Sequence, residues 1–442
     1  MRWRILALLF AARVGLGFQF QTMGAVGPDL STAFGLDHTQ LGVMIGLFMA
    51  PGLFLALPAG VVGRFASDRA LSGLGLGALA VGSAASGLAD APVGIGAGRV
   101  LCGAGFLLTT LYFTKMVADW FEGREIATAM SVLVMSWPFG IAMGQVGHTW
   151  LAEAHGWRVP FAVAALWCAV AALAVVALYR APRGLTPGGP RRMTGLLRRE
   201  WGLIVAAGLA WGLFNAGYVV YLSFGPGVLE AQGMGTLAAA SVISVGSWVM
   251  IVSGALCGQI VDRIGRRDIV IATCMCGAVL ALALLTVPGA GLVASLAFGL
   301  IGMAPAGVIM ALAGQAVAPE RRAFGMGVFF TIYYAAMTAG PPLAGWLLDR
   351  TGAPGSALAF GAALFAAVIP ATIAFRLLVA RGLGAPAADN TTPSPITPSH
   401  PCNSQPGGGT PPRARLHGPV QERAVPRASD GAGGVASSRE CG

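Results

Sequence analysis

The sequence predicts an all-α membrane protein in which twelve transmembrane helices form two pseudo-symmetric bundles of six. Of its 442 residues, 56% are hydrophobic and 10% are charged, with a mean hydropathy of +0.73. Soluble domains carry about 25% charged residues, so lipid solvates most of this chain. Twelve apolar runs, each close to the ~20 residues that cross a bilayer, precede Arg381, and the second six repeat the plan of the first.

The spans are expected to be helices because backbone groups inside lipid must satisfy one another. A membrane barrel would show alternating segments of about ten residues, whereas these runs are continuous. The expected spans are residues 5–26, 41–62, 70–88, 93–118, 126–148 and 159–179, then 201–223, 238–259, 269–287, 292–317, 324–348 and 356–380. Pro28 and Asp29 are expected to end the first span.

The expected domains are a first bundle over residues 1–180, a linker over 181–200, a second bundle over 201–380 and a tail over 381–442. Around the linker, arginines alternate with Pro and Gly and leave no apolar stripe: Arg180, Arg183, Arg191, Arg192, Arg198 and Arg199. The tail is rich in Pro, Gly, Ser and Thr and cannot bury enough apolar surface to fold. It is expected to be disordered.

The net charge of +10 is spread over alternate loops, which predicts orientation in a membrane rather than nucleic-acid binding. Short, positively charged loops stay cytoplasmic, so both termini and the linker are expected inside a bacterial inner membrane. No pair of cysteines has neighbouring histidines or the spacing of a zinc site. Neither a metal nor a cofactor is therefore expected.

One charged turn separates the runs 238–259 and 269–287. Its pattern Gly-x-x-x-Asp-Arg-x-Gly-Arg-Arg is formed by Gly258, Asp262, Arg263, Gly265, Arg266 and Arg267. This spacing resembles the signature cytoplasmic loop of the major facilitator superfamily. The resemblance implies that Asp262, Arg263 and Arg267 latch the cytoplasmic side while the cavity faces out, since Asp suits a helix N-terminus and Arg forms paired contacts. The alternative is a topology anchor only.

The first half carries a weaker copy of this loop over residues 58–69. Arg64 stands about where the Asp is expected, and Ala66 replaces the second Gly. The loop at residues 119–125 likewise matches residues 318–322. Two repeats of six helices imply a central site between two bundles.

Arg99 and Gly103 resemble the family's fourth-helix motif, an Arg followed by spaced glycines. The resemblance implies a role in coupling or substrate handling, and the alternative is an Arg that reaches to the membrane surface. Gly140 and Gly144, after Pro138, look like a loose form of the family's fifth-helix packing motif. The strict Gly-Pro form that is common in drug antiporters is absent.

Polar residues inside spans are costly and are therefore candidates for the substrate site. Arg13 lies about eight residues, or ~12 Å, into the first span and is expected to line a cavity or to pair with a neighbouring helix. Gln21 lies on the same broad face. Lys115 is the only lysine of the chain, and its alternative role is a surface pair with Asp119.

The second half supplies further polar candidates at mid-helix positions: Asn215, Tyr218, Gln315 and Tyr333. Aromatic residues at such spacing often belong to the core, but mid-helix amides need a hydrogen-bond partner. Asp and Glu fall at helix ends or in loops. A cavity with Arg13, and with Arg99 or Lys115, suits an anion better than a cation.

The sequence thus predicts a secondary transporter that moves a small organic or inorganic anion by alternating access. Its partners are expected to be the solute and the lipid bilayer, with protons as a candidate coupling ion and the monomer as the working unit. The alternative is a drug or metabolite efflux antiporter. The five His are expected in loops and in the tail, without the clustered acid–base or metal groups of an enzyme.

Overall fold

The structure, a computed structural model, describes residues 1–62, 66–121, 125–182, 196–318 and 321–383, and all regular structure in these ranges is helical. The predicted all-α membrane class is confirmed. Within the described ranges, eleven helical segments are long and apolar enough to cross a membrane. Helix α13, which corresponds to the expected span 324–348, is not among them. It carries Tyr333, Tyr334 and two prolines.

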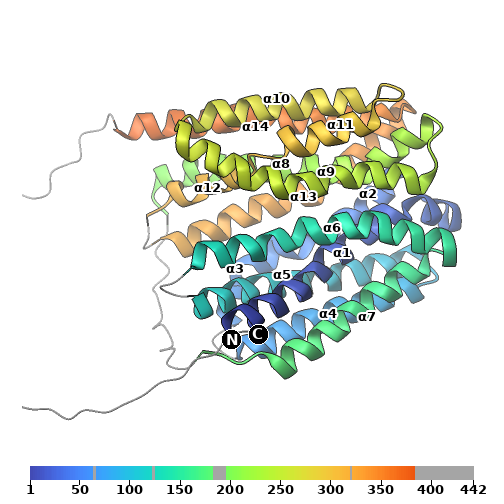
Figure 1. Cartoon of the computed structure of the whole chain (residues 1–442), viewed down its shortest axis with the longest axis horizontal. Coiled ribbons are helices and arrows are strands. Elements are labelled where there is room, and N and C mark those ends of the chain that lie inside the picture. Colours follow the sequence, from blue (N-terminus) through green and yellow to red (C-terminus); the bar gives the residue numbers. More distant parts are fainter. Residues whose placement is uncertain (63–65, 122–124, 183–195, 319–320, 384–442) are drawn as a thin grey trace, which may run out of the picture. The chain divides into compact units, whose positions relative to one another are not determined.

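Helices occupy all the expected spans of both halves, and Figure 1 shows how they are arranged. The first half contains α1 (Arg2–Phe34), α2 (His38–Gly46), α3 (Ala50–Val62), α4 (Asp68–Leu88), α5 (Pro92–Phe121), α6 (Ile126–His155) and α7 (Arg158–Leu178). The second contains α8 (Arg198–Ala231), α9 (Thr236–Ile264), α10 (Arg267–Leu285), α11 (Gly291–Ala297), the π-helical η1 (Phe298–Gly302), α12 (Ala306–Ala316), α13 (Arg322–Thr351) and α14 (Gly355–Leu383).

Two spans that were expected to be continuous are broken. The predicted helix 41–62 is interrupted by a turn at residues 47–49, and Pro51 stands in the first turn of α3. The predicted helix 292–317 passes through η1 and a turn before Pro305 caps α12. Proline lacks a backbone N–H and fits the first turn of a helix, which explains where each new helix begins.

Two other spans extend beyond their expected ends, and each contains a proline. Helix α1 continues through Pro28 to Phe34 and stops at Gly35, whose φ of 66° is left-handed. Helix α8 continues through Pro226 to Ala231. Neighbouring helices in a membrane tolerate such prolines, so the expected ends at residues 26 and 223 were wrong.

The packing partners repeat between the halves. Helix α1 packs on α6 and α7, and α4 packs on α5 and α7. In the same way α8 packs on α13 and α14, and α10 packs on α14 and on the α11–η1 span. The most extensive contacts between the halves are those of α2 and α3 with α13 and of α6 with α9, and α1 also meets α8.

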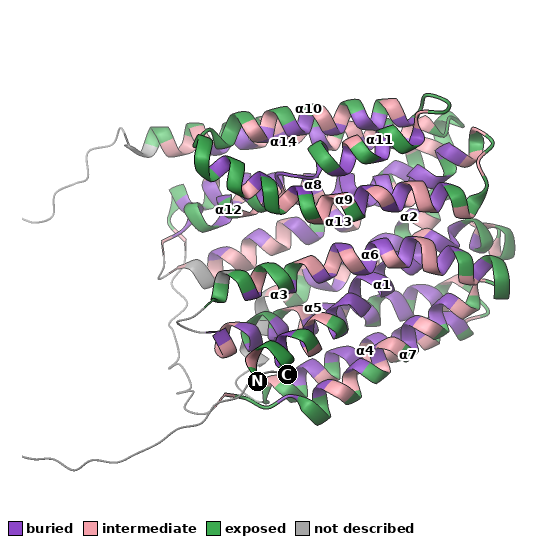
Figure 2. Cartoon of the chain, viewed as in Figure 1, coloured by how far each residue is buried: buried purple, intermediate pink, exposed green. Residues whose placement is uncertain are grey.

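The helix ends define two sides. We call the ends that carry Arg2, Arg263 and Arg321 the arginine-rich side, and the ends that carry His38 and Asp349 the far side. Buried residues lie where helices face one another, and exposed residues lie along their outer faces (Figure 2). The exposed outer residues include large apolar side chains such as Phe54, Leu173 and Leu280, which are 69–78% exposed. Such a surface fits a lipid environment.

Close backbone approach holds α1 against α6. A methyl group at Gly17 would overlap the carbonyl oxygen of Trp137, and one at Gly140 would overlap the carbonyl oxygen of Val14. Small residues let transmembrane helices approach in this way. The glycine spacing seen after Pro138 in the sequence is therefore a packing surface between α6 and α1.

We expect Gly140→Ala to lower the stability of the protein in detergent by about 1–3 kcal/mol, because the added methyl overpacks a backbone contact. Thermal unfolding would measure the change. Gly147→Ala on the same helix is the matched control, since its nearest neighbour, Phe18 Cε2, lies at an ordinary 3.5 Å. Equal melting temperatures for the two variants would contradict this account.

Candidate functional site

Arg13 is a buried cation on α1, at the boundary between the two halves. Its side chain is 9% exposed, and Nη1 donates a hydrogen bond to the carbonyl oxygen of Leu133 on α6 at 2.6 Å. Its buried Nε has no partner, and the ion pairs among the described residues do not include Arg13. Tyr333 and Tyr334 of α13 lie within electrostatic range of the guanidinium, and no hydrogen bond joins either tyrosine to it among the described residues. Arg13 therefore has donor capacity left over for a ligand.

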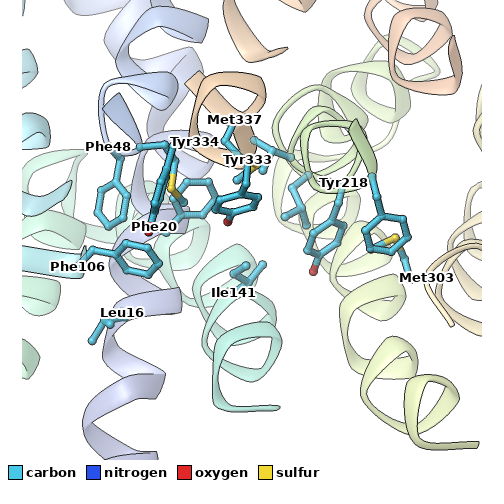
Figure 3. Close-up of a cluster of buried hydrophobic side chains, with 14 of the residues drawn as sticks. Leu16, Phe20, Phe48, Phe106, Ile141, Tyr218, Met303, Tyr333, Tyr334 and Met337 are labelled. Atoms are coloured by element: carbon cyan, nitrogen blue, oxygen red, sulfur yellow. The ribbon is translucent and has the colours of Figure 1, made fainter. Parts of the chain in front are cut away.

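Tyr333 packs among aromatic rings of its own half. Its ring stacks on Trp211 of α8, with centroids 6.3 Å apart, and lies 5.0 Å from the ring of Tyr334. Figure 3 shows Tyr333 and Tyr334 between the first-half rings of Phe20 and Phe106 and the second-half ring of Tyr218. Helix α13 thus brings two hydroxyl groups to the region between the halves.

Gln21 makes its hydrogen bond inside the first half, to Gln145 of α6. Gln19 lies on another face of α1 and donates a hydrogen bond to Cys102 Sγ of α5 at 3.2 Å. Both amides join neighbouring helices, as mid-helix amides in lipid require. The structure therefore separates Gln21 from Arg13, and its role in substrate binding stays a prediction.

A buried histidine lies near the hydrogen-bonded Gln21 and Gln145. His148 is fully buried, with Nε2 2.9 Å from the carbonyl oxygen of Phe18 and 3.1 Å from Thr22 Oγ1. The expected position of His148 at a helix end is wrong, because α6 continues two turns to His155. The spacing of Gln145, His148 and Thr149 on one helical face was the signal that could have identified this polar cluster.

The α8 candidates contact groups of their own half. Asn215 Nδ2 donates to the carbonyl oxygen of Trp211 in the preceding turn at 2.8 Å. The hydroxyl of Tyr218 lies 2.7 Å from Ser247 Oγ on α9 and is almost fully buried. Both side chains have hydrogen-bond partners, whereas the buried Nε of Arg13 has none among the described residues.

Lys115 and Gln315 occupy equivalent places at the arginine-rich side. Lys115 Nζ lies 2.5 Å from Asp68 at the start of α4 and 3.7 Å from Asp119. Gln315 Oε1 accepts a 3.5 Å hydrogen bond from Arg376, which pairs with Asp268 at the start of α10 at 2.8 Å. Both side chains are exposed and join helix ends, so the structure does not bring them to Arg13.

Arg99 uses its donors within the first half. It is fully buried, and its Nε, Nη1 and Nη2 donate to the carbonyl oxygens of Met44, Gln19 and Phe20, each at 3.3 Å. This placement does not fit a side chain that reaches to the membrane surface. A methyl at Gly103 would overlap the Phe48 carbonyl oxygen, so this glycine lets α5 approach the turn at residues 47–49.

The signature turn begins on a helix. Asp262 and Arg263 lie in the last turn of α9, which runs past its expected end at residue 259, and Gly265 ends the helix with a φ of 71°. Gly258 lies one turn earlier, with open space at its Cβ position. Arg266 and Arg267 begin α10. All four charged side chains are exposed, and the described ion pairs do not include them. Arg64 lies outside the described residues.

Ion pairs at the arginine-rich side stay within each half. Arg2 at the start of α1 pairs with Glu125 at 2.7 Å, and Glu200 at the start of α8 pairs with Arg321 at 2.7 Å. The second pair is the repeat of the first with the charges exchanged. At the far side, by contrast, Asp349 of α13 bonds across to α2 of the other half.

A chamber of about 640 Å³ lies between the halves on the far side. Helices α1, α2, α6, α8, α9 and α13 all contribute to its lining, which includes Gln145, Ser223, Glu230 and Asp349. Gln145 Nε2 is buried there without a partner. Its lining includes residues of α2 and α13 where these two helices meet, and exposed residues such as Gly227, Thr236 and Pro354.

The sequence model of the Major Facilitator Superfamily matches residues 9–341 of the chain. The hexuronate transporter of Bacillus subtilis (strain 168) is 27% identical over 398 residues, covering 82% of this chain and 92% of that protein. The gallate transporter of Pseudomonas putida is 23% identical over 157 residues, and that match covers 36% of this chain and 35% of that protein.

Solved structures share the fold. The nucleoside transporter NupG (D323A mutant) superposes with a TM-score of 0.66 at 13% identity, covering 86% of this chain and 99% of that one. A bacterial homologue of the human lysosomal transporter Spinster, in an inward-facing and unoccupied conformation, has a TM-score of 0.66 at 16% identity over 87% of this chain and 99% of that one.

We expect Lys115→Met to leave ligand affinity within about twofold of the wild type, because Lys115 joins exposed helix ends and such pairs contribute little. The measurement is a ligand titration of the purified protein. A loss of tenfold or more would place Lys115 in the site after all.

Proposed function

Because the chain belongs to the Major Facilitator Superfamily, we propose that it moves a small organic carboxylate across a bacterial inner membrane by alternating access. A proton gradient or the gradient of a solute would drive the transport. The family and the two named relatives are transporters, which agrees with the expectation that the chain is not an enzyme.

The observation that carries the substrate class is the spare donor capacity of Arg13. A charged side chain inside a membrane is costly and persists where it has a partner or a function. Arg99 in the same half uses all three guanidinium nitrogens on backbone carbonyls, whereas Arg13 uses one. A carboxylate accepts two parallel hydrogen bonds from a guanidinium, and it would neutralise this charge.

The hydroxyls of Tyr333 and Tyr334 support the same ligand class. They come from the second half and interact electrostatically with Arg13 of the first, so a solute between them would contact both bundles. Hexuronate and gallate, after which the two relatives are named, are organic carboxylates that carry several hydroxyl groups. Hydroxyl groups of the solute could bond to the tyrosines while its carboxylate binds Arg13.

The contacts between the halves support alternating access. Among them, α2 is hydrogen-bonded to α13 at the far side, while the charged groups of the signature turn are exposed and outside the described ion pairs. This arrangement fits a state that is open toward the arginine-rich side. Because positively charged loops stay inside, we assign the arginine-rich side, with the N-terminus, to the cytoplasm.

The test is a binding titration with gallate and a hexuronate, each compared with its uncharged amide. We expect Arg13→Gln to weaken binding of the acid by at least about tenfold, since truncating one partner of a buried charge pair costs about 2–5 kcal/mol. Arg4→Gln, an exposed arginine on the same helix, is the matched control and should bind like the wild type.

Wild-type affinity in Arg13→Gln, or equal affinity for acid and amide in the wild type, would refute the carboxylate assignment. Transport direction needs a separate measurement in membrane vesicles of known orientation. Uptake predicts that the solute accumulates from the far side, whereas the alternative, drug or metabolite efflux, predicts its exclusion.

A further inference from the structure

Helices α10 and α14 lie side by side in the second half (Figure 1) and leave a groove between them at the arginine-rich side. The groove has a volume of about 360 Å³, within the range of roughly 300–1,000 Å³ that is usual for ligand pockets. These two helices supply its whole lining, which includes Ile373 and Leu377. Both side chains are more than half exposed, so the groove opens toward the lipid. We call it the α10–α14 groove.

The groove has one charged end and one apolar end. At the charged end, Arg376 of α14 pairs with Asp268, the second residue of α10, at 2.8 Å. This end therefore lies at the membrane surface, where α10 begins. Ile369, which also lines the groove, lies seven residues before Arg376 on α14, or about 10 Å deeper in the membrane. The groove thus runs from the surface into the hydrocarbon, as a lipid molecule does.

The equivalent helices of the first half, α4 and α7, pack closely. Asp68 begins α4 much as Asp268 begins α10, and Tyr179 at the end of α7 is buried within electrostatic range of Asp68. A methyl at Gly73 of α4 would overlap Val176 Cγ2 of α7. Tyr179 thus fills the place that corresponds to the charged end of the groove. The repeated fold by itself does not require a groove there.

Arg376 has donor capacity that the protein does not use. Its Nε donates to Asp268 Oδ1 at 2.8 Å, and Nη1 donates to Gln315 Oε1 at a long 3.5 Å. Among the described residues, Nη2 has no hydrogen-bond partner. A guanidinium can bind two oxygens of one phosphate group with parallel hydrogen bonds. Nη2 and the weakly used Nη1 are available for this contact while Nε stays paired with Asp268.

The charge around the groove favours an anionic ligand. Arg267 precedes Asp268 at the start of α10, and Arg381 follows Ala380, the last lining residue of α14. With Arg376, three arginines stand against one aspartate and leave a net charge of +2. Each Arg or Lys near a membrane surface strengthens the attraction of anionic lipids by about 1 kcal/mol.

We propose that the α10–α14 groove binds one anionic phospholipid, with its phosphate on Arg376 and an acyl chain along Ile369, Ile373 and Leu377. Basic pockets between transmembrane helices at the cytoplasmic side bind lipid head groups in this way. The groove shares no lining residue with the far-side chamber, and Arg13 belongs to the other half. The lipid site therefore depends neither on the carried solute nor on the direction of transport.

The test is native mass spectrometry of the delipidated full-length protein in detergent, titrated with dioleoyl phosphatidylglycerol. The intensities of the free form and of the form with one bound lipid give the dissociation constant. Dioleoyl phosphatidylcholine has the same chains but a zwitterionic head group, and we expect it to bind at least about fivefold more weakly. Glycerol phosphate carries the phosphate without chains, and it should not displace the lipid at equal concentration.

Two variants address the two ends of the groove. We expect Arg376→Gln to weaken binding of phosphatidylglycerol by about fivefold, the contribution of one arginine near an anionic lipid. Arg4→Gln, an exposed arginine at the same side but on α1, is its matched control. Ala272→Phe keeps Arg376 but fills the groove with a ring, and it should weaken binding by at least about fivefold. Its control is Ala374→Phe, at an exposed position of α14 outside the lining.

Both controls should bind phosphatidylglycerol within twofold of the wild type. The lipid site is refuted if Ala272→Phe or a folded Arg376→Gln also binds within twofold. Equal losses in Arg376→Gln and Arg4→Gln would refute it too, because they would show diffuse attraction by the whole arginine-rich side. Equal affinity for phosphatidylcholine, or displacement by glycerol phosphate, would overturn the choice of an anionic phospholipid. Thermal unfolding shows which variants are folded, and Ala272→Phe keeps the Arg376–Asp268 pair, so it decides the question if Arg376→Gln does not fold.

Discussion

Helices inside a bilayer gain little from the hydrophobic effect when they associate, since lipid tails are as apolar as their side chains. This constraint explains which contacts hold the chain together. Helix α1 meets α6 through Gly17 and Gly140, and α2 meets α13 through Gly42, Gly46 and Gly345. In both cases glycines let the backbones of two helices come into direct contact. Close packing of the backbones therefore contributes to holding each pair of helices together.

The same constraint separates two buried arginines of the first half. Arg99 joins α5 to the backbones of α1 and α2 with three hydrogen bonds, and its guanidinium carbon lies 4.6 Å from the ring centroid of Phe48. Arg13 has one carbonyl partner among the described residues, and tyrosines of the other half lie within electrostatic range of it. Arg99 is therefore part of the scaffold, whereas Arg13 keeps a buried Nε that has no partner among the described residues. Burial alone did not distinguish them.

The two sides of the molecule use charge differently. At the arginine-rich side, Arg2 with Glu125 and Glu200 with Arg321 each fasten the first helix of a half to the segment before its fifth span. These pairs can persist while the halves move. At the far side, Asp349 bonds from one half to the other, so under the proposed alternating access its hydrogen bonds would break when that side opens. A transporter needs both kinds of contact, within rigid halves and between moving ones.

Hydropathy, the repeat and the signature turn were enough to predict the helical membrane class and the family from the sequence, because the bilayer imposes helix length and loop charge on any chain that crosses it. The polar candidates inside the spans were also visible, including Arg13 and Tyr333. Only the tertiary structure decided their partners. Pro28 and Pro226 did not stop their helices, His148 proved to be buried, and Lys115 and Gln315 proved to join helix ends. The physical reason is that a side chain's role in lipid depends on which donors and acceptors neighbouring helices present to it, and helices far apart in the sequence supply those groups.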